Sequence, residues 1–298
     1  MSNSWQYYLI RIVSWLLCLL PYHWLLALGK LLGRVYYRVA DRQRLRACRQ
    51  AQEGLGVSEA EAAAMIRRLF IKLGQTFLEV LYMPVLNREN VGRFVTVENR
   101  HYLEEALAQG RGAIFLSAHV GNWEWMGATF GLTGVPLASI IKPQPNEQHT
   151  RVLNEYRQKA GIRIFNRGTT ELVGVARALK QGYFVGFFAD QDAGPGGLFI
   201  DFLGRLASTP RGPATFARRL KVPIIPVFIV RRPEGGHRIL LQPSFTYEDT
   251  GDETADLYNL TVRMTRIIED VIRQYPDEWL WFQKRWNTKP SEKAGGSA

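Results

Sequence analysis

Hydrophobic residues follow two patterns along the chain: one apolar run near the amino terminus, and alternating strands and helices after Val95. The run from Ile12 to Gly29 contains no Asp, Glu, Lys or Arg, which meets the length of a candidate membrane span. Pro21 and His23 lie in its middle and would allow two short helices in the plane of a membrane surface instead. A single span, an in-plane anchor and a buried core helix are therefore all open alternatives.

A second helical segment begins at a capping box, Ser58 with Glu61, in which each side chain satisfies an open backbone amide. Apolar residues then recur every four positions and stop before Pro84, at Met65, Leu69, Leu73, Phe77 and Leu81. This spacing predicts a packing helix without chemistry of its own.

Beyond Val95, short apolar runs alternate with helical patterns. We expect strands at 113–118, 137–141, 162–165, 183–189, 223–230 and 238–242. We expect helices from about residue 122, and at 146–160, 170–181, 210–220 and 255–274. Such alternation is typical of an α/β fold, with a mostly parallel mixed sheet flanked by helices. The last eight residues are polar and rich in Gly, which predicts a disordered tail at 291–298.

Composition narrows the class of protein. Hydrophobic residues make up 46% and charged residues 22% of the chain, which excludes a disordered protein. The net charge of +11 favours an acidic partner, such as nucleic acid, an anionic membrane, an acidic protein or a phosphorylated substrate. The two cysteines, Cys18 and Cys48, are unrelated in position. We therefore expect a reducing compartment, no disulfide, no zinc site and no cofactor.

Basic residues follow the apolar run and are typical of the cytoplasmic side of a membrane; they are Lys30, Arg34, Arg38, Arg42, Arg44, Arg46 and Arg49. We expect a membrane anchor at 1–40 and the main domain at 41–290, on the cytoplasmic side and held against the inner face of a membrane. A cleaved signal peptide fits poorly, because the first residues carry no basic charge and no small-residue cleavage site follows the apolar run.

The chemistry concentrates in the segment Ser117-Ala-His-Val-Gly-Asn-Trp-Glu124. His119 ends a predicted buried strand, where a sheet delivers side chains to an open edge. Gly121 allows a tight turn, after which the carboxylate of Glu124 can fold back to the imidazole. A carboxylate on one ring nitrogen leaves the other free to accept a proton from a hydroxyl. A single histidine at a strand end is more often structural, so further motifs are needed.

The segment from His119 to Glu124 resembles the His-x4-Asp/Glu motif of glycerolipid-type acyltransferases, in the Glu form of the lipid A biosynthesis late acyltransferases (lauroyl and myristoyl transferases). Further segments resemble that family in the same order along nearly the whole chain. They are Arg167-Gly-Thr-Thr, Asp190-Gln-Asp, Phe202-Leu-Gly (with Leu where the family usually has Phe), Thr209-Pro-Arg211-Gly-Pro-Ala, Val222-Pro-Ile-Ile-Pro226 and Pro276-Asp-Glu-Trp279-Leu-Trp281 through Arg285-Trp286.

The resemblance implies transfer of a fatty acyl chain from acyl carrier protein to a hydroxyl of a lipid A precursor. It implies His119 as the general base and Glu124 as the residue that orients it. Arg167, Asp190 and Arg211 would be substrate-binding residues, with Arg167 on a phosphate or on the thioester oxygen. The net positive charge suits both an acidic carrier protein and a phosphorylated lipid.

Other readings stay open. Acyl-coenzyme A could replace acyl carrier protein as the donor, and another membrane glycolipid or phospholipid could replace lipid A as the acceptor. A serine hydrolase would need a Gly-x-Ser-x-Gly elbow, which the chain lacks. A basic protein that binds lipid or nucleic acid is a different class. The loop Gly194–Gly197 lacks the spacing of a nucleotide-binding loop, so we expect no nucleic-acid partner.

Overall fold

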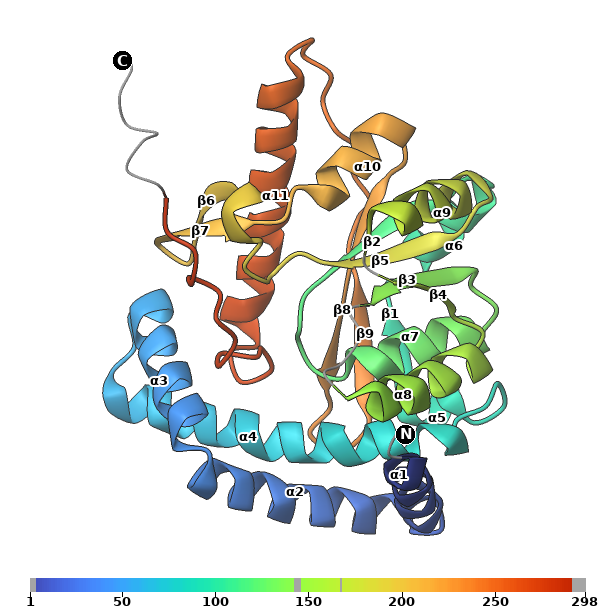
Figure 1. Ribbon diagram of the computed structural model, residues 1–298, viewed down its shortest axis with the longest axis vertical. Coiled ribbons are helices and arrows are strands. Elements are labelled where there is room, and N and C mark those ends of the chain that lie inside the picture. The colour runs from blue at the N-terminus through green and yellow to red at the C-terminus, as the bar shows by residue number, and fades with distance from the viewer. Residues whose placement is uncertain (1–3, 142–145, 167, 291–298) are drawn as a thin grey trace.

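A computed structural model describes residues 4–141, 146–166 and 168–290 (Figure 1). The chain begins with four successive helices, and the capping box predicted at Ser58 and Glu61 is formed at the start of the fourth. These helices are α1 (Ser4–Cys18), α2 (Tyr22–Val39), α3 (Asp41–Leu55) and α4 (Glu59–Tyr82). A short turn, η1 (Met83–Val85), and helix α5 (Val91–Phe94) then lead into the sheet.

The central element is a seven-stranded sheet in the order β1-β9-β8-β2-β5-β3-β4. All its neighbouring pairs are parallel except β8 with β9, so the prediction of a mostly parallel mixed sheet is confirmed. Its strands are β1 (Val95–Glu98), β2 (Ala113–Ser117), β3 (Leu137–Ile141), β4 (Arg163–Asn166), β5 (Phe184–Phe188), β8 (Ile224–Arg231) and β9 (His237–Leu241).

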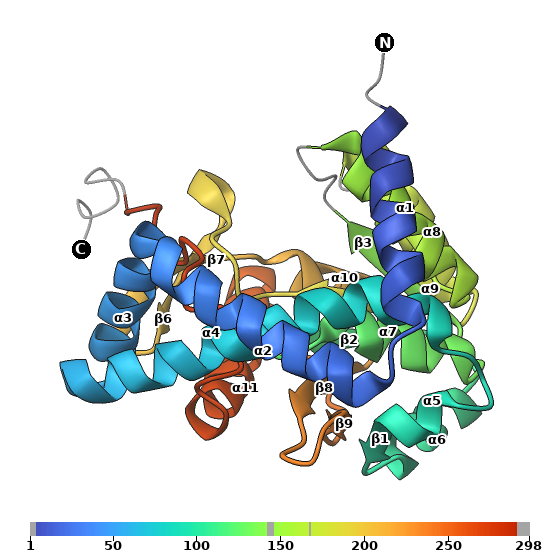
Figure 2. The same cartoon turned by 90° about the horizontal axis from the view of Figure 1, so that it is seen from below.

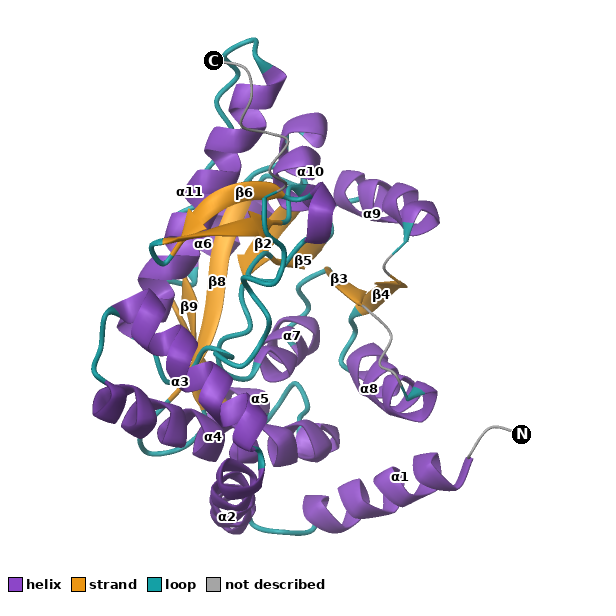
Figure 3. Cartoon of the chain, turned by 60° about the vertical axis from the view of Figure 1, so that its left-hand side comes forward, coloured by secondary structure: helices purple, strands orange, loops and turns teal. Residues whose placement is uncertain are grey.

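Helices cover both faces of this sheet (Figure 3). The face that carries Ile114 and Val185 packs against α9 (Thr169–Lys180), α10 (Gly212–Leu220) and α11 (Glu253–Gln274). The opposite face, with Phe115 and Phe184, packs against α6 (His101–Ala108), α7 (Trp123–Leu132) and α8 (Glu147–Lys159). Beside the sheet, η2 (Gly194–Gly196) leads into an antiparallel hairpin of β6 (Leu198–Phe202) and β7 (Arg205–Thr209).

The amino-terminal apolar run forms two helices that meet at Pro21, rather than one. Among the described residues, no helix combines the length and the apolar character needed to cross a bilayer. The expectation that Pro21 could divide the run into two helices is confirmed. Whether residues 1–40 act as a membrane anchor stays a prediction.

Helix α2 lies along α4 at very close range (Figure 2). Gly29 and Gly33 of α2 face Gly74 of α4, and a Cβ atom on Gly33 would overlap the carbonyl oxygen of Phe70. Only glycine permits the two backbones to approach in this way. Leu25, also on α2, is completely buried, so α2 is packed into the same core as the rest of the chain.

Helix α1 lies beside α8, at the other end of the molecule from α3 (Figure 2). The Tyr7 hydroxyl donates to Glu155 of α8 at 2.9 Å, and Arg11 forms an ion pair with the same carboxylate at 3.2 Å. The Tyr156 hydroxyl donates to Ser14 at 2.7 Å. These contacts use the polar side of α1 and leave its apolar side exposed.

Candidate active site

His119 and Asp190 leave two neighbouring strands at the same edge of the sheet. Strand β2 ends at Ser117 and its parallel neighbour β5 ends at Phe188, and these two residues are paired in register. His119 and Asp190 each follow two residues after that pair. Because parallel strands deliver their carboxyl ends to one edge, the two side chains meet although 71 positions separate them in sequence.

The carboxylate of Asp190 binds His119 twice. Its Oδ1 lies 2.9 Å from the ring Nδ1, and its Oδ2 accepts the main-chain N–H of His119 at 2.9 Å. An ionised carboxylate only accepts hydrogen bonds, so we assign the imidazole proton to Nδ1. Nε2 is thereby left as the nitrogen that can accept a proton from a substrate.

Asp190 is fully buried and is hydrogen-bonded to further protein groups besides His119. Its Oδ2 also accepts the indole N–H of Trp279 at 2.8 Å and the amide of Gln283 at 3.0 Å. Burial alone would raise the pKa of Asp190, but the charge and hydrogen bonds of His119, together with the Gln283 amide, outweigh it and hold that pKa below its ordinary range. The residue expected to bind substrate therefore lies behind the imidazole, where it orients His119.

Only a small part of the His119 imidazole is exposed to solvent. Burial disfavours the charged ring, yet the Asp190 carboxylate outweighs this effect, so the pKa of His119 is raised above its ordinary value. The side chain retains 18% of its exposure. The Gln191 amide lies 3.4 Å from Nε2, and the rings of Trp123 and Phe188 lie about 5 Å from the imidazole centre.

Glu124 lies in the first turn of α7, as expected, but its carboxylate does not bind the imidazole. It forms a two-point ion pair with Arg157 of α8, with Oε2 accepting from Nε at 2.8 Å and Oε1 from Nη2 at 2.5 Å. The prediction that Glu124 orients His119 is corrected, because Asp190 occupies that position. Glu124 is nevertheless close enough for its charge to contribute to the raised pKa of His119.

The turn between His119 and α7 has its backbone fixed on two sides. Gly121 has a positive φ of 60°, and a Cβ at this position would overlap the carbonyl oxygen of Ile229. The expected tight turn at glycine is thus confirmed, with a close backbone approach as a second reason for it. The Gly121 N–H also donates to the Glu278 carbonyl at 3.0 Å, and the Leu280 N–H donates to the His119 carbonyl at 3.1 Å.

The two arginines expected to bind substrate are placed differently. Arg167 lies outside the described residues, so its role stays a prediction. Arg211 is the residue that precedes the first turn of α10, as expected, and its side chain is exposed. Its guanidinium forms no hydrogen bond or ion pair with any part of the chain that the structure describes, so its role also stays a prediction.

Arg157, Trp279 and Gln283 belong to the site but were not singled out for it. Arg157 lies in a helix that the sequence predicted, yet helical periodicity does not say which charged residue faces a neighbouring helix. Trp279, with Trp281 and Trp286, was expected to be core packing, and all three are buried. The added finding is that the Trp279 indole binds Asp190.

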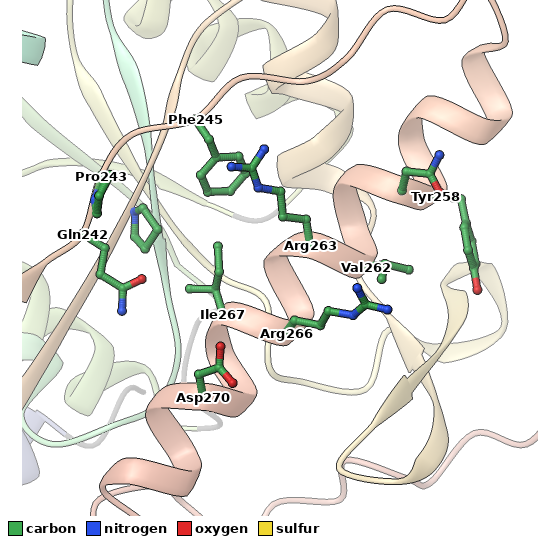
Figure 4. A pocket seen from close by; sticks show the side chains of 11 residues that line it. Gln242, Pro243, Phe245, Tyr258, Val262, Arg263, Arg266, Ile267 and Asp270 are labelled. Atoms are coloured by element: carbon green, nitrogen blue, oxygen red, sulfur yellow. The ribbon is translucent and has the colours of Figure 1, made fainter.

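A separate hollow lies away from His119. It measures about 720 Å³ and lies between α11 and the segments at the start of β8 and the end of β9 (Figure 4). Its wall includes Phe245, Arg263 and Asp270, and Arg263 stacks on the Phe245 ring at 4.2 Å. None of His119, Glu124 and Asp190 lines it, so it is separate from the candidate active site.

Comparisons with known proteins show which family the chain resembles. A family described as "Bacterial lipid A biosynthesis acyltransferase" matches residues 1–288. The lipid A biosynthesis palmitoleoyltransferase of Escherichia coli is 28% identical over 93% of this chain and 90% of its own. The phosphatidylinositol mannoside acyltransferase of Mycolicibacterium smegmatis is 24% identical over 74% of this chain and 72% of its own.

A solved structure of the 1-acyl-sn-glycerophosphate acyltransferase PlsC from Thermotoga maritima also matches. It covers 80% of this chain and 99% of its own, with 16% identity and a TM-score of 0.40. The family match extends over almost the entire chain, and it includes both His119 and Glu124. The chain therefore belongs to the bacterial lipid A biosynthesis acyltransferase family and is an acyltransferase.

Proposed function

We propose that the protein transfers a fatty acyl chain from acyl carrier protein to a hydroxyl of a lipid A precursor, with His119 as the general base. The observation that carries this proposal is the pairing of the His119 ring with buried Asp190. It fixes the proton on Nδ1 and leaves Nε2 at the accessible edge of the sheet. This is the arrangement needed to activate an alcohol without a nucleophile from the protein.

In this reaction the acceptor hydroxyl replaces the Gln191 amide as the partner of Nε2. The hydroxyl oxygen attacks the thioester carbonyl carbon while its proton passes to Nε2. The carbon–sulfur bond of the tetrahedral intermediate then breaks, and the imidazolium returns the proton to the departing thiolate of the carrier. The Asp190 carboxylate stabilises the imidazolium between the two steps and is itself not protonated.

Glu124 and Arg157 contribute a second charged pair beside the base. Their side chains are only 12% and 14% exposed, so the pair holds α7 and α8 in one arrangement. A guanidinium binds carboxylate and phosphate oxygens with paired hydrogen bonds. We assign Arg157 to the side of the site where an oxygen-rich substrate group enters, together with Arg167 and Arg211 as expected from the sequence.

The acceptor is a membrane lipid, and the amino-terminal helices present a surface that suits a membrane. Among the described residues, 14 of the 21 exposed large hydrophobic side chains lie between Trp5 and Val39. They are Trp5, Tyr8, Leu9, Ile12, Val13, Trp15, Leu16, Leu19, Trp24, Leu28, Leu31, Leu32, Val35 and Val39. An apolar helical face edged by basic residues is typical of a helix lying in the membrane surface.

Basic side chains continue this surface. Lys30, Arg34 and Arg38 of α2 and Arg42 of α3 are exposed, and each basic residue near an anionic leaflet adds about 1 kcal/mol of attraction. We therefore place the protein at the cell inner membrane, with α1 and α2 as an in-plane anchor and the sheet on the cytoplasmic side. The net charge of +11 also favours an acidic carrier protein as the donor.

The test is transfer of a labelled acyl group from acyl carrier protein to a purified lipid A precursor. We expect transfer by the wild-type protein, and faster transfer from the carrier protein than from acyl-coenzyme A at equal concentration. Equal rates from both donors would overturn the assignment of the donor. Failure with every lipid A precursor, but transfer to another lipid, would overturn the assignment of the acceptor.

A second acceptor class is a membrane glycolipid other than lipid A. The match to the phosphatidylinositol mannoside acyltransferase favours this alternative, because that protein shares 24% identity over 74% of this chain. Both reactions acylate a hydroxyl of a phosphorylated glycolipid and use the same chemistry at His119. Parallel assays with a lipid A precursor and a phosphatidylinositol mannoside, at matched concentrations, distinguish the two acceptors.

A further inference from the structure

A buried cluster of polar side chains lies behind the segment that joins His119 to α7, and Glu79 of α4 is its centre. Glu79 is fully buried, and two nitrogens of Arg231 bind its two carboxylate oxygens at 2.7 Å each. His237 lies 2.9 Å from Oε2, and the Tyr22 hydroxyl donates to Oε1 at 2.6 Å. We call these four residues, together with Asn122, the Glu79 cluster.

Asn122 connects the Glu79 cluster to the candidate active site. Its Nδ2 donates to Glu79 Oε2 at 3.0 Å, while its Oδ1 caps α7 by accepting the Trp125 N–H at 3.1 Å. The Trp125 indole N–H donates to the main-chain carbonyl of Glu79 at 2.8 Å. Asn122, which precedes Glu124, and Trp125, which follows it, are thus both bound to Glu79 of α4.

The ionised state of Glu79 is what makes this arrangement possible. Burial would raise the pKa of Glu79, but His237 and Arg231 outweigh it and hold that pKa below its ordinary range. The carboxylate can therefore accept from every donor around it. A buried ion pair is weak evidence of a role in stability, because apolar residues of similar volume often serve as well. A role in fixing geometry explains why the donors come from α2, α7, β8 and β9 and meet at this segment.

We propose that Glu79 is a positioning residue for acyl transfer: through Asn122 and Trp125 it fixes the segment between His119 and Glu124. This inference rests on the proposed function, because it assigns Glu79 to the same reaction. Displacing a catalytic group by about 1 Å can reduce a rate on the order of 10²-fold. Glu79 binds Asn122 through its carboxylate and the Trp125 indole through its main-chain carbonyl, and these two hydrogen bonds hold the first turn of α7 against such a displacement.

The experiment substitutes each partner of the hydrogen bond between Asn122 and Glu79, which we call the Glu79 link. Asn122→Asp keeps an oxygen that caps α7 but puts a second carboxylate against Glu79. Glu79→Gln removes the charge and keeps the shape. In the double variant Glu79→Gln/Asn122→Asp, the new amide can donate to the new carboxylate, so the link is restored with its direction reversed. Thr76→Val is the matched control, because it removes only a 3.2 Å contact with Arg231.

We expect kcat to fall at least about 10-fold in each single variant, with KM for the acceptor within about 2-fold, as for a loss of geometry rather than of binding. The double variant should recover to within about 3-fold of wild type, and Thr76→Val should keep the wild-type kcat. Hydrogen exchange of the amides of residues 118–126 should be faster in both single variants and slower again in the double variant.

Three outcomes would overturn the proposal. One is wild-type kcat in both single variants, and another is a double variant no more active than the slower single variant. The third is unchanged exchange at residues 118–126 in both single variants. Hydrogen exchange needs no substrate, so it tests the role of Glu79 separately from the proposed function. If the double variant regains slow exchange but the wild-type protein transfers no acyl chain, the proposed donor or acceptor is refuted and the Glu79 link stands.

Discussion

Asp190 accepts two hydrogen bonds from one residue, the main-chain N–H of His119 at 2.9 Å and the ring Nδ1 of His119 at 2.9 Å. The same carboxylate therefore fixes the backbone that carries the imidazole and the rotation of the ring. A carboxylate that bound only the ring would leave the backbone free to shift. The pair explains how a histidine at a strand end is left with one defined ring nitrogen, Nε2, free to accept a proton.

The first prediction concerns that base. His119→Ala should reduce acyl transfer by at least about 10²-fold, because general-base catalysis contributes on the order of 10²–10⁴-fold. The measurement is transfer of a labelled acyl chain, with thermal unfolding as the check that the variant is folded. A folded variant with near-normal transfer would refute His119 as the base.

The second prediction is a pH dependence that follows from the raised pKa of His119. The neutral ring is the base, so kcat/KM should rise with pH through a midpoint above the ordinary value of about 6.5. Asp190→Asn removes the charge that favours the imidazolium, so the midpoint should move to lower pH and the plateau should fall about 10²-fold. A pH profile of kcat/KM checks both; an unmoved midpoint would show that Asp190 does not set this pKa.

The stability that the same pair contributes should have the opposite dependence on pH. A group whose pKa is raised in the folded protein stabilises it fully below its unfolded pKa, about 6.5 for histidine. This contribution is lost as pH rises through the raised pKa of His119. Denaturant unfolding of wild type and His119→Ala across that interval measures it, and a difference that grows with pH would contradict the assignment.

The third prediction concerns the pair of Glu124 and Arg157. Removing one partner of a largely buried ion pair leaves an uncompensated charge, which costs about 3–5 kcal/mol for fully buried pairs and less here, since both side chains retain some exposure. Arg157→Met and Glu124→Gln should each lower stability, and each should reduce transfer on the order of 10²-fold, because α7 and α8 would shift beside His119. The double variant should lose less than the sum of the two; additive losses would refute the coupling.

The fourth prediction concerns the exposed face of α1 and α2. Leu16→Glu combined with Trp24→Glu should weaken binding to anionic vesicles in a flotation assay, because a charge on this face opposes its insertion. Val173→Glu on α9 is the control, since Val173 is 64% exposed but lies outside this face. Equal flotation of all three proteins would refute the anchor. Deleting residues 1–40 is a poorer test, because Leu25 and Gly33 belong to the packed interior.

Most strands of the central sheet and the position of His119 at the end of one of them were predictable, but the contact between His119 and Asp190 was not. Periodicity predicted β2 and β5 and placed His119 and Asp190 just after them. It could not show that β5 pairs with β2, because β3 and β4 lie between them in the sequence. Glu124, five positions from His119, was therefore the natural choice for its partner. The sequence allowed either one helix or two helices around Pro21. The close approach of α2 to α4 could not be predicted, because it depends on glycines of both helices that are far apart in the sequence.

Helix α8 restricts which substitutions α1 can accept. Glu155 receives Tyr7 and Arg11 of α1, and two positions later Arg157 holds Glu124. The first helix of the protein and the motif of its family thus meet through a single turn of α8. A substitution in α1 that displaces Glu155 should therefore also change the rate of acyl transfer. Exchanging α1 between relatives therefore requires exchanging the facing turn of α8 with it.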